Sequence, residues 1–126
     1  ATYGPELGGL TVVGAHTMRP PFAGRQLEQM MALGDELSAA GGAQIVAGDF
    51  NATPGSLMLQ TLVSRAGLRL ASGLATWPAN FGLPQIAIDH IMVSPTLRIL
   101  TPAQIGASAG SDHYPVIADI AIPLSE

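Results

Sequence analysis

The chain has 126 residues, a net charge of −4 and no cysteine, which excludes a disulfide framework and a thiolate metal site. Only 11% of the residues are charged and 48% are hydrophobic, so a single domain of this length should bury most of its chain. Its five basic residues are all Arg and lie scattered along the chain, which does not indicate a nucleic-acid partner.

The first half of the chain predicts a strand–helix–strand unit. Leu10–Ala15 is short, β-branched and apolar, as is typical of a buried strand. Apolar residues at helical spacing predict a helix over Arg25–Ala40 that ends at Gly41–Gly42. Gln44–Ala47 is predicted as the second strand. A strand, a crossover helix and a strand form the βαβ unit of a parallel pair.

The second half predicts one more helix and several strands, so the fold class is α/β. The expected elements are a helix over Ser56–Ala66, loops over 71–85 and 105–110, and strands over Ile86–Val93, Leu97–Leu100 and Tyr114–Ile122. Ile86–Val93 has apolar residues on both faces, which predicts a central strand with Asp89 in its interior.

Several polar residues lie at the predicted ends of these strands or within them. They are His16, Asp49, Asn51, Asp89, Asp112 and His113. In open α/β sheets, ligands bind outside the strand ends, where loops and side chains converge. The pattern therefore indicates a functional site at one edge of the sheet.

Each residue also has a structural explanation. Asp49 is typical of a turn and Asn51 of a helix N-cap. His16 fits a strand end, Asp112 a turn cap and His113 a polar strand start. A purely structural role fits Asp89 least, because burying an ionised carboxylate in an apolar strand costs free energy unless a cation or a histidine pairs with it. His90 should point to the opposite face of the strand, so we expect a structural role for it.

Taken together, the six residues favour one chemistry. Carboxylates and an Asn suit Mg²⁺ or Mn²⁺, which prefer oxygen ligands and keep several waters. Two histidines suit acid–base work or the stabilisation of a phosphoryl oxygen, and an Asp behind a His fixes its tautomer. The set predicts metal-assisted hydrolysis of a phosphate ester.

Four motifs carry a family resemblance over nearly the whole chain: VVGAHT (12–17), IVAGDFNATP (45–54), ATWPANFGLPQIAIDHIMVS (75–94) and GSDHYPVIADI (110–120). Their order and spacing resemble the C-terminal half of the endonuclease/exonuclease/phosphatase superfamily, and most of all its bacterial members of uncharacterised substrate. The resemblance implies half of a four-layer α/β/β/α sandwich over residues 1–126, with a mixed sheet, helices on one face and the N-terminal half absent.

The resemblance also implies roles for the candidate residues. Asp49 would orient or deprotonate the attacking water, and Asn51 would hold the phosphate or the metal-side geometry. His16 would hydrogen-bond the scissile phosphate. His113, oriented by Asp89, would act as acid–base or stabilise developing charge. Asp112 would bind Mg²⁺ or Mn²⁺ directly or through water, with Asp49 and Asn51 as the other metal-side residues. On an extended segment Asp49 and Asn51 would face the same way.

The chain departs from the family pattern in one respect. The family's first half supplies a metal-binding Glu and an early Asn, and neither motif is present here. An apolar sheet face would then need cover from a second copy or from the missing N-terminal half. The alternatives are a catalytically incomplete fragment or pseudoenzyme that binds anions or dimerises, and an unrelated α/β binding module. The location is open, although bacterial relatives are often attached to membrane segments, which fits an extracytoplasmic parent.

Overall fold

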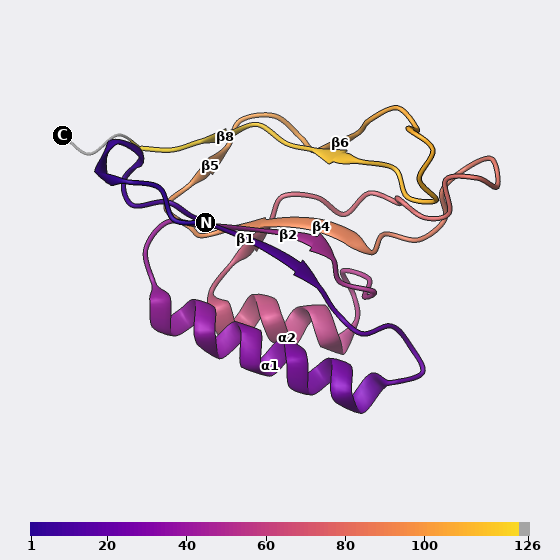
Figure 1. Cartoon of the computed structure of the whole chain (residues 1–126), viewed down its shortest axis with the longest axis horizontal. Helices are drawn as coiled ribbons and strands as arrows, with labels where there is room; N and C mark the ends of the chain where they lie inside the picture. The colour runs from indigo at the N-terminus through magenta and orange to yellow at the C-terminus, as the bar shows by residue number, and fades with distance from the viewer. Residues whose placement is uncertain (124–126) are drawn as a thin grey trace.

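The structure is a computed structural model that describes residues 1–123. In chain order its elements are the short 3-10 helix η1 (Pro5–Leu7), β1 (Thr11–His16), α1 (Ala23–Ala40), β2 (Gln44–Asp49), α2 (Leu57–Ala66), β3 (Arg69–Leu70), β4 (Asp89–Val93), β5 (Arg98–Ile99), β6 (Gln104–Ile105), β7 (Val116–Ile117) and β8 (Ile120–Ala121). The predicted α/β class, with a mixed sheet and helices on one face, is confirmed (Figure 1).

The main sheet has the strand order β1-β2-β4-β3. β1 and β2 are parallel and α1 connects them, which confirms the βαβ unit. β4 runs antiparallel to both of its neighbours and lies inside the sheet, as predicted. The predicted position of Asp89 was wrong, because β4 begins at Asp89. Ile86 instead forms a bridge with Trp77, so the chain joins the sheet later than the apolar run suggests.

Both helices cover one face of this sheet (Figure 1). The buried side of α1 is Gln26, Met30, Gly34 and Leu37, and the buried residues of α2 are Leu59 and Leu62. They pack with Val46, Phe50 and Met92 of the sheet side. The helices approach closely at Gly34, where an added Cβ would lie 2.7 Å from the Arg65 Cβ. Ser56 caps α2, since its side chain accepts from the Leu59 N–H at 3.3 Å.

Two short strand pairs lie over the other face of the sheet (Figure 1). The predicted single strand Tyr114–Ile122 was wrong: β7 pairs with β6 and β8 pairs with β5. Asp119 separates the two pieces, because its carbonyl accepts from the Leu100 N–H and its carboxylate from the Thr101 hydroxyl, both at 2.9 Å. β6 includes Ile105, the first residue of the predicted 105–110 loop.

The two strand pairs leave apolar side chains in solvent. Leu100, Ile105 and Ile117 are exposed there, whereas Leu10, Val93 and Leu97 form a small buried cluster beneath. Within residues 1–123, neither helix is long and apolar enough to cross a membrane.

Candidate functional site

Three of the candidate residues lie next to one another across the sheet. His16 at the end of β1 is in register with Asp49 at the end of β2, and Asp49 is in register with Asp89 at the start of β4. Paired positions on neighbouring strands bring side chains within contact range. The main sheet thus aligns a histidine and two carboxylates along one edge, as the sequence pattern predicted.

Gly48 makes this close pairing feasible. Its φ is 154°, and an added Cβ would lie 1.8 Å from the carbonyl oxygen of Ala15 on β1. Only glycine lacks the Cβ that would collide with this backbone. The glycine of the GDFN motif is therefore required for β1 and β2 to approach just before Asp49.

Asp89 and His113 form the central contact of the site. The Nδ1 atom of His113 lies 2.8 Å from the Asp89 Oδ2, and the Thr76 hydroxyl donates to the same oxygen at 2.5 Å. Thr76 is fully buried. Because a carboxylate accepts, His113 donates from Nδ1 and leaves Nε2 for other contacts. This partner explains how a carboxylate is accommodated at the start of an apolar strand.

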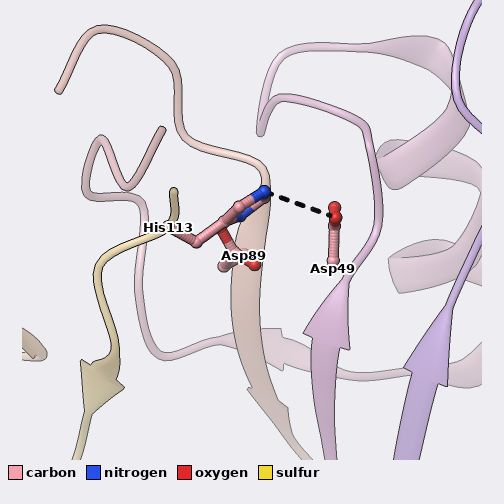
Figure 2. Close-up of side chains that lie close together, drawn as sticks. All are labelled: Asp49, Asp89 and His113. Carbon is pink, nitrogen blue, oxygen red and sulfur yellow. Dashed lines mark hydrogen bonds and ion pairs between the residues drawn. The ribbon is translucent and has the colours of Figure 1, made fainter. Parts of the chain in front are cut away.

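Asp49 lies between the two histidines of the site. Its Oδ2 is 4.0 Å from His113 Nε2 and 3.6 Å from His16 Nε2. Figure 2 shows His113 extending from the segment before β7 toward Asp49 at the tip of β2. The side chain of His16 is 76% exposed, whereas those of Asp49 and His113 are 22% and 25% exposed. The carboxylate is thus within reach of one sheltered and one open imidazole.

The surrounding carboxylates favour a protonated His113. Burial alone lowers its pKa, but the hydrogen bond to Asp89 and the charges of Asp89, Asp49 and Asp112 outweigh burial and raise the pKa above 6.5. A histidine with its pKa raised in this way keeps its proton closer to neutral pH. His113 is therefore a group that can hold or donate a proton at Nε2.

The turn after β2 holds Asn51 differently from the expectation. Asn51 has a φ of 47°, so the segment is not extended and the predicted alternation does not apply. Its N–H donates to the Asp49 Oδ1 at 2.9 Å, and its Nδ2 donates to the carbonyl of Thr17 at 2.9 Å. Nor is Asn51 a helix N-cap, because Ser56 has that role. Both side chains still line the same groove.

Two buried polar side chains fix this turn. Gln26 of α1 donates from Nε2 to the carbonyls of Phe50 and Asn51, at 3.0 and 3.1 Å. Thr17 donates its hydroxyl to the same Phe50 carbonyl at 2.5 Å. The sequence pattern alone did not predict site roles for Gln26 and Thr76. A polar residue within the apolar stripe of α1 was the available signal for Gln26, and a loop assignment hid Thr76.

Asp112 lies at the outer rim of the site, with its side chain 64% exposed. Its Oδ1 is 4.0 Å from His113 Nε2. The backbone on each side is anchored to the 76–79 segment, because Ala79 N–H donates to the Asp112 carbonyl at 2.7 Å and Tyr114 N–H to the Thr76 carbonyl at 2.9 Å. These bonds hold Asp112 and His113 beside the strand ends.

His90 belongs to the core, as expected. It is 1% exposed and its Nε2 lies 2.8 Å from the Ala52 carbonyl oxygen, to which it donates. Burial lowers its pKa more than the hydrogen bond to Ala52 and the charges of Asp89 and Asp49 raise it, which favours the neutral form of the ring. Nδ1 then has no hydrogen-bond partner among the described residues. His90 therefore packs within the core and also borders the cavity beside Asp49 and Asp89.

An open groove of about 1120 Å³ unites the candidate residues. His16, Asp49, Asn51, Asp112 and His113 line it, while Asp89 lines an adjoining cavity of about 410 Å³ together with Asp49 and His113. All six residues that the sequence singled out therefore gather at one place. Ligand sites are commonly concave regions with a few convergent polar groups.

The site offers oxygen ligands suited to a hard divalent cation. Ligand atoms of Asp49, Asp89 and His113 lie within 4.8 Å of one another. The Oδ2 of Asp89 accepts the hydrogen bonds from Thr76 and His113, whereas Asp49 Oδ2 and the exposed Asp112 face the groove as further carboxylate donors. One or two carboxylates plus waters are the usual ligands of Mg²⁺, so the residues present fit such an ion.

The comparison with known families gives one match: residues 2–113 match the family described as Endonuclease/Exonuclease/phosphatase family. No curated protein matches. Several solved structures match this chain. Three of them are each less than 25% identical to it in sequence, so their likeness shows a shared fold.

Three solved structures illustrate the likeness. A functionally unknown conserved protein from Enterococcus faecalis V583 is 22% identical, with a TM-score of 0.72 over 89% of this chain and 50% of that one. A mannosyl-6-phosphatase from Bacteroides thetaiotaomicron is 18% identical, with a TM-score of 0.64 over 89% and 50%. A beta toxin from Staphylococcus aureus, solved with bound magnesium ions, is 21% identical, with a TM-score of 0.56 over 85% and 51%. The chain thus spans about half the length of these structures.

Proposed function

This chain belongs to the endonuclease/exonuclease/phosphatase family, and we propose that its site takes part in the metal-dependent hydrolysis of a phosphate ester within the complete parent domain. Members of this family are hydrolases that act on phosphoesters. The observation that carries the proposal is the pairing of Asp89 with His113 at 2.8 Å, with His113 Nε2 turned toward Asp49.

The carboxylate of Asp49 orients the attacking water or takes its proton in this proposal. Its Oδ1 is held by the Asn51 N–H, and its Oδ2 faces the groove between the two histidines. A carboxylate that is held in place beside the open groove can accept a hydrogen bond from a water molecule and orient it toward a bound phosphate. His16, which is largely exposed, donates a hydrogen bond to the scissile phosphate.

His113 stabilises the negative charge that develops on the phosphoryl oxygens. Asp89 accepts its Nδ1–H and thereby fixes the tautomer, while Thr76 fixes Asp89. The raised pKa of His113 keeps a proton on Nε2, where it can be donated to a phosphoryl or leaving-group oxygen. Asn51 donates one Nδ2 hydrogen to the Thr17 carbonyl, which orients the amide, and its Oδ1 is the atom that can accept a hydrogen bond or bind a cation.

Magnesium or manganese is the cofactor that the donor set supports. Asp49 and Asp112 would hold it, with Asn51 as a neutral oxygen donor and waters completing the shell. When bound, the ion supplies charge neutralisation at the phosphate. The beta toxin match is consistent with this choice, since that protein carries magnesium.

A direct test uses the 126-residue chain with bis(p-nitrophenyl) phosphate and p-nitrophenyl phosphate, in Mg²⁺ or Mn²⁺ and with EDTA as a control. We expect metal-dependent turnover that falls at least about 100-fold in Asp49→Ala, the typical size of an acid–base contribution. Asp35→Ala is the matched control, because it removes an exposed carboxylate that pairs with Arg65 and does not line the groove.

A second candidate is a non-hydrolytic role in binding an anion or a second copy. It is favoured by the exposed apolar side chains of Leu100, Ile105 and Ile117 on the strand pairs, which a second copy would bury. No turnover in any metal, combined with tight binding of inorganic phosphate at His16 and His113, would support this candidate and overturn hydrolysis by the chain itself.

A further inference from the structure

The groove extends beyond the polar cluster, and there its walls are apolar. Around the first turns of α1 and α2 and along the 77–88 segment, its side chains are Phe22, Leu57, Met58, Trp77, Ile86 and Ile88. Phe22, Leu57 and Ile86 are 53%, 66% and 37% exposed. Single exposed apolar residues are ordinary, but a contiguous set beside polar residues marks a binding surface.

The charges along the groove do not suit a polyanion. Arg19 is the one Arg or Lys side chain among its lining residues, and Asp49 and Asp112 are acidic. Nucleic-acid grooves rely on many phosphate contacts from Lys and Arg, so this wall is poorly equipped for a long backbone. A phosphate ester with one phosphoryl group and one apolar part would suit this groove, because the phosphoryl group fits the polar cluster and the apolar part fits the apolar walls.

A loop beside the groove carries the most exposed large apolar side chains of residues 1–123. Phe81 and Leu83 are 76% and 82% exposed. The loop base is closed by the Gln85 N–H, which donates to the Trp77 carbonyl at 2.9 Å, and is tied to the site by the Ala79–Asp112 hydrogen bond. In Figure 1 this loop extends at the same end of the sheet as the tips of β1 and β2.

Resting on the proposed function, we propose that the substrate is an amphiphilic phosphoester held in a lipid surface. Its phosphoryl group lies at Asp49 and His113, and its apolar part lies between Phe22, Leu57 and Ile86. Phe81 and Leu83 contact the lipid surface beside the mouth of the groove. Two separate apolar features next to one phosphoryl site carry this assignment, and the low positive charge favours an amphiphile over a nucleic acid.

The groove is tested first with a single-chain alkylphosphocholine below its micelle concentration, and with phosphocholine as the control that lacks the chain. Trp77 is the only tryptophan of the protein and lines the groove, so its fluorescence reports binding there without metal or turnover. We expect a saturable change with the alkyl compound alone, weakened at least about threefold in Leu57→Ala. Leu100→Ala, an exposed leucine outside the groove, is the matched control. Equal responses to both compounds would overturn the proposal.

The lipid surface is tested by co-sedimentation with phosphatidylcholine vesicles. We expect binding that falls at least about tenfold when Phe81→Ala and Leu83→Ala are combined, because two large apolar side chains are lost. The combination of Leu100→Ala and Ile117→Ala should change little. Equal losses in the two double variants, absence of vesicle binding, or tighter binding to an oligonucleotide than to vesicles would each overturn the proposal.

The two proposals fail separately. Turnover of a soluble phosphoester by a chain that binds neither amphiphile would overturn the lipid assignment and keep hydrolysis. Binding of both amphiphiles by a chain that hydrolyses no phosphoester would support the groove assignment and count against hydrolysis, since neither binding measurement depends on the metal.

Discussion

Asp89 and His113 meet at 2.8 Å although 24 positions separate them in the chain. β4 supplies the carboxylate and the segment before β7 supplies the imidazole, so the contact depends on two different layers of the fold. The resulting pair leaves only one imidazole nitrogen, Nε2, to act toward Asp49.

Replacement of Asp89 should alter the pH dependence of turnover. In Asp89→Asn, His113 loses both its charged hydrogen-bond acceptor and a nearby negative charge, so its pKa falls. The protonated form is then lost at lower pH, and the alkaline limb of the pH–rate profile shifts to lower pH, with kcat reduced by about 10-fold or more. A histidine NMR titration with the same variant measures the pKa directly. An unchanged His113 pKa would contradict the assigned role.

His113 should also contribute a pH-dependent part of stability. Its folded pKa lies above the unfolded value, so this contribution is fully present below about pH 6.5 and is lost as the pH rises through the folded pKa. The free energy of unfolding lost in His113→Gln should therefore be greater at about pH 5 than at about pH 8.5. Urea unfolding at both pH values measures it, and an equal loss at both would count against a raised pKa.

His16 and His90 should separate activity from stability. His90 is buried and donates to the Ala52 carbonyl, so His90→Ala leaves a cavity and an unpaired acceptor and should cost about 2–4 kcal/mol of unfolding free energy. His16 is 76% exposed at the side chain, so His16→Ala should cost less than about 0.5 kcal/mol and yet reduce turnover. Thermal unfolding and phosphoester assays on both variants check this, and a stable, active His16→Ala chain would refute the site role.

Gly48 should not tolerate a side chain. Gly48→Ala places Cβ 1.8 Å from the Ala15 carbonyl oxygen, so β1 and β2 must separate, and we expect a loss of about 2 kcal/mol or more. Gly24→Ala is the matched control, because nothing lies within 4 Å of its added Cβ at the start of α1. That substitution should be neutral or slightly stabilising through helix propensity. Similar unfolding midpoints for the two variants would contradict the strand approach seen here.

The apolar strand pairs should promote association of the 126-residue chain. Ile117 of β7 is in register with Gln104 of β6 and is 55% exposed, so a second copy or another half of the parent domain would bury it. Sedimentation should show dimers or larger species that weaken in Ile117→Asp. A monomer that stays soluble at high concentration would argue against this partner prediction.

The sequence by itself determined the elements with strong local patterns. The spacing of Met30 and Leu37 placed α1, the apolar run before Asp49 placed β2, and the order of four motifs gave the family that residues 2–113 confirm. Such features depend on periodicity and on short motifs, which a single chain displays directly. The clustering of polar residues at the strand ends was also predictable, because the strand ends themselves follow from these local patterns.

The tertiary structure decided how those polar residues pair. The break of Tyr114–Ile122 at Asp119, the late start of β4 at Asp89 and the positive φ of Asn51 depend on hydrogen bonds to partners far along the chain. Gln26 and Thr76 gain their roles only from the carbonyls and carboxylate that the fold brings to them. Local propensity is weak compared with the free energy of satisfying buried polar groups, so contacts of this kind become visible only when the chain is folded.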